Sequence, residues 1–164
     1  MTGKRDRLLY RVKRSMYPSN RPNGAARLLN RVSAARFATG LLVPHRAVTL
    51  EVTGRRSGRT ISFPLVLVDY EDGRYIVSML GEDVNWVRNV RAADGRAVLR
   101  HRWCEPVRVI EIDPADRAPI LRRYLELAPG ARPHVPVDRD APLEEFARIA
   151  DRFPVFRVTS DLYQ

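Results

Sequence analysis

From residue 47 onward, hydrophobic and polar residues alternate in several short runs, which is the pattern of half-buried β-strands. The clearest run begins at Ala47, where Val48, Leu50 and Val52 are separated by polar residues. A Glu-Asp-Gly sequence at residues 71–73 predicts a tight turn between two antiparallel strands. The predicted strands cover residues 47–53, 61–69, 74–79, 96–102, 107–112 and 154–158, with the turn of the 96–112 pair near residues 105–106.

Hydrophobic residues spaced three and four apart predict several helices. These helices cover residues 25–37, 83–95, 113–127 and 142–149, with Asp83 as the N-cap of the second. Residues 128–140 are rich in proline and predict an irregular loop that is long enough to cover a site. Strands dominate and no regular alternation of strand and helix appears. The pattern therefore favours a mainly β (α+β) fold, an antiparallel barrel with flanking helices, over a doubly wound parallel sheet.

The chain of 164 residues carries a formal net charge of +10, and that charge is concentrated at one end. Residues 1–36 hold ten lysines and arginines against one acid, so nine of the ten net charges lie there. We therefore divide the chain into a basic N-terminal arm with an amphipathic helix (residues 1–36) and a nearly neutral barrel domain (residues 37–164). An arm of this kind is attracted to anionic lipid, nucleic acid or an acidic partner.

Composition excludes several other classes of protein. The sequence has no apolar stretch long enough to span a membrane and no apolar signal region, so we expect the protein to stay in the cytoplasm. Cys104 is the only cysteine, which rules out an intramolecular disulfide, and we expect it to be a buried strand residue. His45 and His101 do not have the spacing of metal ligands, and we expect no metal site. A catalytic triad of Ser57, His101 and Asp113 has no support in the sequence.

The segment Gly-Arg-Arg-Ser-Gly-Arg at residues 54–59, between two predicted strands, is a candidate anion site. Its two glycines permit a tight turn whose N–H groups can face an anion, and its three guanidinium groups are donors suited to phosphate or carboxylate. The alternative is an ordinary hairpin turn with solvated arginines. The segment lacks the pattern of a Walker loop and that of a dinucleotide-binding loop.

Residues 78–89 join a strand to the start of a helix and form a second candidate segment. Free N–H groups at a helix start favour a negative ligand group, and Asn89 lies on the same helix face as Trp86 and Val90, where its amide needs a partner. The alternative is that Trp86 belongs to the core and that Asn89 is a hydrogen-bonded buried amide.

Taken in order, four segments resemble the deazaflavin-dependent nitroreductase and quinone reductase family: residues 54–58, Pro64-Leu65, residues 86–92 and residues 154–156. The resemblance spans about residues 47–158. It implies a split β-barrel like that of FMN-binding proteins, coenzyme F420 as the cofactor, and the turn as the site of its phosphate and oligoglutamate tail. The cofactor-binding residues implied are Arg55, Arg56, Ser57, Gly58, Ile61, Ser62, Phe63, Pro64, Leu65, Val66, Val77, Ser78, Met79, Leu80, Asn85, Trp86, Val87, Arg88 and Asn89.

The activity implied by this resemblance is hydride transfer from reduced F420 to a quinone, a nitro compound or an activated alkene. The protein would bind and orient the cofactor and exclude water. Many family members have Ser and Lys where this chain has Met79 and Leu80, and several Tyr where it has His134. The candidate proton donors are His134 and Tyr124, for which the alternatives are an exposed loop histidine and a tyrosine packed in a helix.

Other functions remain open from the sequence. The same barrel could hold FMN, haem or a lipid without acting as a reductase. The basic arm could bind nucleic acid, but it has few aromatic residues for base stacking and the rest of the chain is neutral, so this partner is disfavoured. Attachment to an anionic membrane surface through residues 1–36, on the inner face of the cell membrane, fits the mixture of leucine and arginine better.

Overall fold

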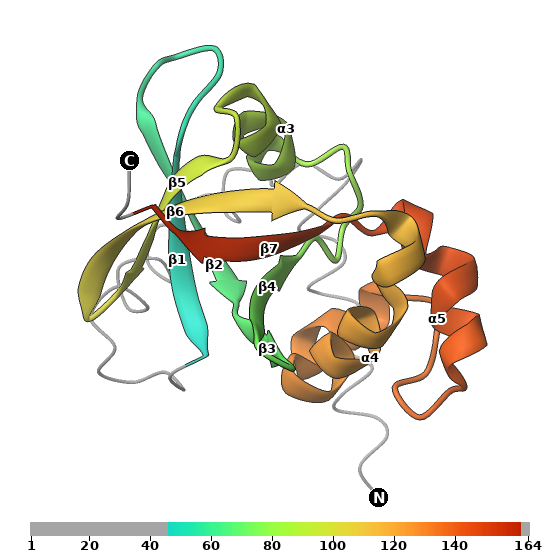
Figure 1. Ribbon diagram of the computed structural model, residues 1–164. Helices are drawn as coiled ribbons and strands as arrows, with labels where there is room; N and C mark the ends of the chain where they lie inside the picture. The colour runs from blue at the N-terminus through green and yellow to red at the C-terminus, as the bar shows by residue number, and fades with distance from the viewer. Residues whose placement is uncertain (1–45, 162–164) are drawn as a thin grey trace, which may run out of the picture.

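The computed structural model describes residues 46–161, in which seven strands form one antiparallel sheet (Figure 1). The order of strands across the sheet is β2-β1-β5-β6-β7-β4-β3. Contacts between β2 and β4, which are not hydrogen-bonded neighbours, show that the sheet curls into a half-barrel. The predicted antiparallel split barrel with flanking helices is confirmed. The strands are β1 (Ala47–Thr53), β2 (Thr60–Val66), β3 (Val68–Tyr70), β4 (Gly73–Val77), β5 (Arg96–His101), β6 (Trp103–Glu111) and β7 (Val155–Ser160).

A first core fills the space between the curled sheet and helix α3 (Asn85–Ala92). Val48, Leu50 and Val52, the alternating residues of β1, are all buried in it. β1 is hydrogen-bonded to β2 on one side and to β5 on the other. Because β1 leads directly into the turn at residues 54–59, this well-buried strand anchors one end of the candidate anion site.

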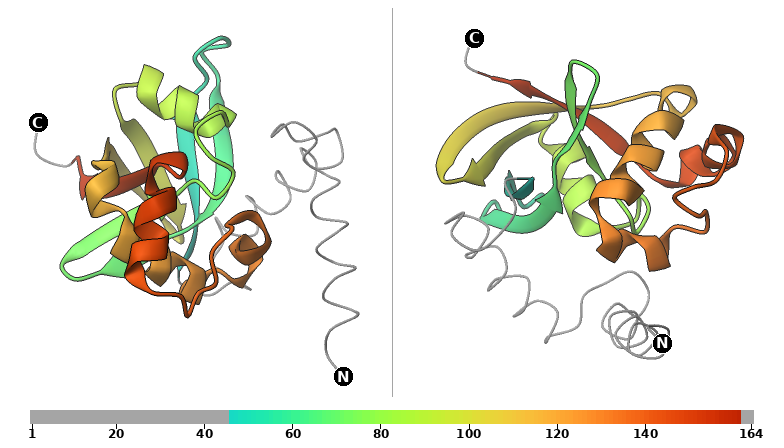
Figure 2. Two further views of the ribbon diagram at one scale, coloured as in Figure 1. Left: turned by 90° about the vertical axis from the view of Figure 1, so that its right-hand side faces the viewer. Right: turned by 90° about the horizontal axis from the view of Figure 1, so that it is seen from below.

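A second core lies where α4 (Ala118–Leu127) and α5 (Leu143–Ile149) pack against each other and against β3 and β4. Figures 1 and 2 show these two helices together, apart from α3. A 3₁₀ helix, Pro129–His134, lies within the predicted irregular loop and packs on the same core. Two further 3₁₀ helices, Pro114–Asp116 and Ala150–Arg152, precede α4 and follow α5.

Several predicted boundaries differ from the structure. The predicted strand at residues 61–69 is interrupted at Leu67, so it forms β2 and β3. The predicted helix at residues 113–127 is divided into Pro114–Asp116 and α4, while Asp113 caps the first piece by accepting a hydrogen bond from the N–H of Ala115.

Two predictions of local geometry were wrong. Asp83 is not the N-cap of α3, because Val84 takes that position and the Asp83 carboxylate pairs with Arg88 instead. The turn between β5 and β6 is at Arg102, whose φ is 53°, and not at residues 105–106. Pro106 is tolerated inside β6 because the ladder to β7 ends at Val107, so no β7 residue needs an N–H from residue 106, while the Pro106 carbonyl still accepts from the N–H of Asp161.

Cys104 was predicted to be buried, and it is exposed. It lies two residues after the Arg102 turn, at the end of a hairpin where Trp103 is also exposed. The basic arm and the predicted helix at residues 25–37 lie outside the described residues. Among residues 46–161, no helix is long and apolar enough to cross a membrane.

Candidate functional site

The turn at residues 54–59, which we call the anion turn, is closed by its own backbone. The N–H of Gly54 donates to the carbonyl of Arg59 at 2.8 Å, and the N–H of Gly58 donates to the carbonyl of Gly54 at 2.8 Å. A side chain at residue 54 would lie 2.7 Å from Ile61 Cδ1, and Gly58 has a φ of +66°. A side chain at residue 54 would force the ends of the Ile61 and Ser57 side chains to move, and glycine is favoured at residue 58 by its backbone conformation.

Hydrogen bonds join the anion turn to the start of α3. The side-chain oxygen of Asn89 accepts from both the backbone N–H (3.3 Å) and Nη1 (2.8 Å) of Arg55. The oxygen of Asn85 lies 3.5 Å from Nη2 of the same arginine. Asn89 is buried, so Arg55 is the partner that its amide needs. Two segments that the sequence singled out separately are thus brought together at one place, visible at the upper end of β1 in Figure 1.

The anion turn has an excess of donors. Within residues 46–161, none of Arg55, Arg56 and Arg59 pairs with a carboxylate, and the backbone N–H groups of Arg56 and Ser57 donate to no described residue. Other arginines of the sheet behave differently, since Arg74 and Arg100 each make two hydrogen bonds to a glutamate. A set of exposed cationic and N–H donors without carboxylates has the chemistry that a phosphate or carboxylate ligand requires.

The predicted residues that follow the turn differ in how much of their side chains is accessible. Those of β2 from Ile61 to Val66 are half-buried along an edge strand of the sheet. Met79 and Leu80 are also half-buried, whereas Val77 and Ser78 are buried. The Ser78 hydroxyl donates to the carbonyl of Gly81 at 2.6 Å.

The predicted residues of α3 are largely part of the core. Trp86 is 7% exposed and packs against Phe156 with ring centroids 5.5 Å apart, so the reading of Trp86 as a core residue is confirmed. Val87 is fully buried in the same core. Arg88 is partly accessible and pairs with Asp83.

The two candidate proton donors lie in the α4 region. Tyr124 is buried in the second core, and burial raises the pKa of its hydroxyl above the ordinary value. His134 is half-buried at the end of the Pro129–His134 helix. Neighbouring residues Ala131 and Val135 belong to the same core as the half-buried Val66 and Met79. The segment of His134 and these two predicted ring-lining residues thus pack on the same core.

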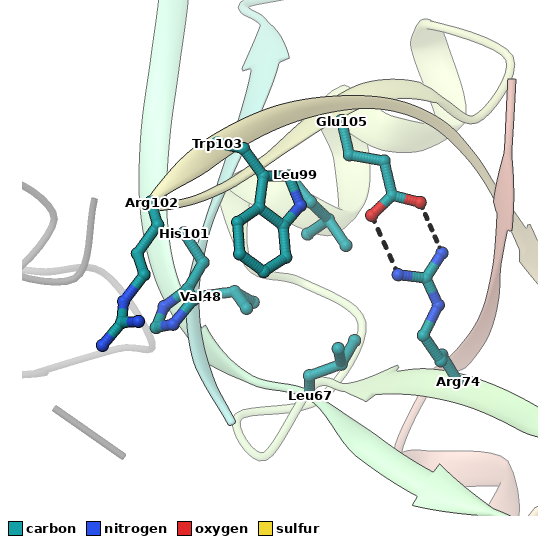
Figure 3. A pocket seen from close by; sticks show the side chains of 8 residues that line it. All are labelled: Val48, Leu67, Arg74, Leu99, His101, Arg102, Trp103 and Glu105. Atoms are coloured by element: carbon teal, nitrogen blue, oxygen red, sulfur yellow. Dashed lines mark hydrogen bonds and ion pairs between the residues drawn. The ribbon is translucent and has the colours of Figure 1, made fainter. Parts of the chain in front are cut away.

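A cavity of about 310 Å³ lies elsewhere in the half-barrel, and the sequence did not indicate it (Figure 3). None of its residues belongs to the predicted cofactor-binding set. They come from β1, the β2–β3 connection, β4 and the β5–β6 hairpin, so no local motif could have revealed them. The cavity is lined by Val48, Leu67, Arg74, Leu99, His101, Arg102, Trp103 and Glu105.

Across residues 46–161, no three histidine, cysteine or acidic side chains gather as metal ligands would.

The sequence of residues 26–139 matches the family model described as F420H(2)-dependent quinone reductase. No curated protein sequence matches the chain. The matched range includes both the anion turn and α3.

Two of the solved structures, with TM-scores of 0.50 and 0.54, share the fold. A chain described as a domain-swapped dimer is 19% identical with a TM-score of 0.50, and the match covers 94% of this chain and 98% of that one. A protein of unknown function from Agrobacterium tumefaciens is 15% identical with a TM-score of 0.54, covering 88% and 58%. An F420-H2 dependent reductase is 25% identical with a TM-score of 0.43, covering 71% and 96%.

Proposed function

The chain belongs to the F420H(2)-dependent quinone reductase family, and we propose that it transfers a hydride from reduced coenzyme F420 to a quinone. It is an F420-dependent oxidoreductase, and coenzyme F420 is its cofactor. The observation that carries the proposal for the site is the anion turn, with three arginines that have no carboxylate partner among the described residues.

The chemistry of the anion turn fits the tail of this cofactor, which carries a phosphate and glutamate carboxylates. Arg56 and Arg59 would donate to those groups directly, together with the N–H groups of Arg56 and Ser57. Arg55 is already held by Asn89, so its guanidinium enters the site in a fixed orientation. Fixing a donor before binding lowers the entropy that is lost when the ligand arrives.

The half-buried residues beyond the turn would line the deazaflavin ring and its ribityl chain. These are the residues of β2 from Ile61 to Val66, together with Met79 and Leu80. Their largely apolar side chains would exclude water from the reacting face. When bound, the reduced deazaflavin supplies the hydride from its C5 atom, and the role of the chain is to bind, orient and enclose.

We propose His134 as the residue that supplies a proton to the acceptor. Its segment packs on the same core as Val66 and Met79, whereas Tyr124 is buried and its raised pKa keeps its proton bound. His134→Gln should lower the rate of acceptor reduction while leaving the dissociation constant for F420 unchanged. Equal turnover by this variant across the pH range would remove His134 from the mechanism.

The acceptor is tested by anaerobic assay of the full chain with reduced F420. We expect a quinone such as menadione to reoxidise the cofactor faster than nitro compounds or activated alkenes, which are the other acceptors this chemistry allows. When substituted variants such as His134→Gln are assayed in the same way, Arg122→Ala is the control. Arg122 is an exposed arginine on α4 without a partner among the described residues. Binding of F420 without reoxidation by any of the three acceptor classes would refute the proposed reaction.

We also propose that residues 1–36 attach the protein to an anionic membrane surface on the cytoplasmic side. Nine net positive charges support this, because each basic residue near such a surface contributes about 1 kcal/mol. Deleting residues 1–23 should abolish salt-sensitive sedimentation with phosphatidylserine vesicles and leave F420 binding intact. Undiminished sedimentation of the shortened chain would exclude the arm as the attachment.

A further inference from the structure

The cavity shown in Figure 3 has an apolar floor and an aromatic wall. Val48 and Leu99 are core residues, and Leu67 follows β2. Trp103 is 63% exposed and its ring is directed toward the cavity (Figure 3). The volume of about 310 Å³ is at the lower end of the range for small-molecule sites, so the cavity suits a single flat ring.

Polar groups lie on two sides of this floor. On one side, Nη1 and Nη2 of Arg74 donate to the two carboxylate oxygens of Glu105 at 2.9 and 2.6 Å. A carboxylate can accept more bonds than these two, so Glu105 keeps acceptor capacity for a ligand. Its hydrogen bonds to Arg74 also lower the pKa of Glu105, which keeps the group ionised.

On the other side lies His101. Its Nδ1 is 3.0 Å from the carbonyl oxygen of Ala47. A carbonyl can only accept, so Nδ1 carries the hydrogen, and Nε2 is the ring nitrogen left to accept one from a ligand. The His101 and Trp103 rings pack edge to face, with their centroids 6.0 Å apart, which stabilises the relative position of the two side chains. The cavity thus has an acceptor on each side, an apolar floor and an aromatic wall.

We propose that this cavity binds a small planar phenol, with the ring against Trp103 and a hydroxyl group donating to Glu105 or to Nε2 of His101. The site is separate from the anion turn, since Val48 and Gly54 are six residues apart on an extended chain, which corresponds to about 20 Å. A hydroquinone, which is the product of the reaction proposed above, is a small planar phenol. Only the choice of hydroquinone as the ligand rests on the proposed function.

The experiment titrates the ¹⁵N-labelled, cofactor-free full chain with hydroquinone under anaerobic conditions. We expect saturable shifts at the backbone amides of Val48, Leu67 and Leu99 and at the indole N–H of Trp103. The matched ligand 1,4-dimethoxybenzene has the same ring but no hydroxyl donor, and it should bind about tenfold more weakly. Equal affinity for the two ligands, or shifts that spread elsewhere, would overturn the proposal.

Three variants separate a cavity effect from a loss of folding. Leu67→Phe fills the cavity and should weaken hydroquinone binding at least about tenfold, whereas Ile110→Phe, an exposed residue of β6 outside the cavity, should not change it. Glu105→Gln should weaken hydroquinone binding but not binding of the ether. If neither cavity variant changes the affinity for hydroquinone, the ligand does not bind there. F420 is absent from this titration. A failure to bind hydroquinone would therefore overturn the cavity proposal but leave the proposed F420-dependent reaction to be tested by its own assay.

Discussion

Arginine has opposite roles in two regions of this protein, the segment before α4 and the anion turn. Arg117 is 5% exposed, and all three nitrogens of its guanidinium donate hydrogen bonds within the fold. Its Nε donates to the carbonyl of Ile112 at 3.0 Å and its Nη2 to Glu111 at 3.1 Å. Its Nη1 lies 3.2 Å and 3.4 Å from the carbonyls of Ala150 and Phe153. Arg56 and Arg59 of the anion turn are exposed and have no such partners among residues 46–161.

The difference shows how to separate a structural arginine from a binding one. Arg117 ties the segment before α4 to β6 and to the segment after α5, so its contribution is to the stability of the fold. Arg56 and Arg59, which are exposed and without such partners among the described residues, contribute little to stability. Their donors are therefore available to a ligand. Substitution of Arg117 should therefore lower the stability of the fold, and substitution of Arg56 or Arg59 should lower the affinity for the ligand.

The largest effect should come from Arg117→Met. Without the guanidinium, the carbonyls of Ile112, Ala150 and Phe153 lose their donor. Each buried acceptor left unpaired costs about 1–3 kcal/mol, so the free energy of unfolding should fall by about 3 kcal/mol or more. Urea denaturation measures this loss directly. F420 affinity of the folded fraction should be unchanged, and Arg122→Ala should change stability by less than about 0.5 kcal/mol. A variant as stable as the wild type would remove the distinction between the two regions.

Asn89→Ala should have a smaller effect on stability and should also affect binding, because Asn89 links the fold to the turn. The loss of a buried amide and its hydrogen bonds to Arg55 should lower the free energy of unfolding by about 1–3 kcal/mol. F420 affinity should fall about tenfold as Arg55 loses its orientation.

A double-mutant cycle tests whether Asn89 acts through Arg55. The losses of F420 affinity in Arg55→Ala and Asn89→Ala should be markedly non-additive, since each variant removes the same interaction. Asn85→Ala serves as the control, because its contact with Arg55 is longer, at 3.5 Å, and exposed. Strictly additive losses would mean that Asn89 does not position Arg55.

The smallest effect on stability should come from the ion pair of Arg74 and Glu105. This pair is partly exposed, so it is intermediate between the buried Arg117 and the exposed arginines of the anion turn. The hydrogen bonds from Arg74 lower the pKa of Glu105 in the folded chain. The pair therefore adds stability above the unfolded pKa of Glu105, and this stability is lost as the pH falls through the lower folded value. Glu105→Gln should reduce the free energy of unfolding at pH 7 by at most about 1 kcal/mol. The difference from the wild type should disappear in acid, and a difference that grows in acid would contradict the assignment.

Most of the fold could be predicted from the sequence, because the alternation in residues 47–53 and the Glu-Asp-Gly turn are local signals. The errors have non-local causes. Asp83 has the character of an N-cap but pairs with Arg88. Pro106 looked like a turn residue, yet the end of the β7 ladder makes room for it inside β6. Sequence periodicity carries no information about where a neighbouring strand stops.

The candidate sites also differ in whether their residues are close together in the sequence. The anion turn is contiguous in sequence, so its glycines and arginines could be recognised, and the need of Asn89 for a partner could be inferred from its helix face. That Arg55 is this partner required the fold. The cavity near Trp103 was missed altogether, because its residues are individually ordinary and meet only when the sheet curls.

If the anion turn holds the phosphate and glutamate tail of F420, Arg56→Ala should weaken binding of the whole cofactor but not of its ring. Each charge-assisted hydrogen bond to the tail should contribute about 1.5–3 kcal/mol, so the variant should bind F420 roughly tenfold to a hundredfold more weakly. A deazaflavin that lacks the phosphate and glutamates should bind the wild type and the variant equally, and Arg122→Ala should bind both ligands as the wild type does. Fluorescence titration with oxidised cofactor measures all six dissociation constants. Unchanged F420 affinity in Arg56→Ala, or equal weakening for both ligands, would contradict the claim.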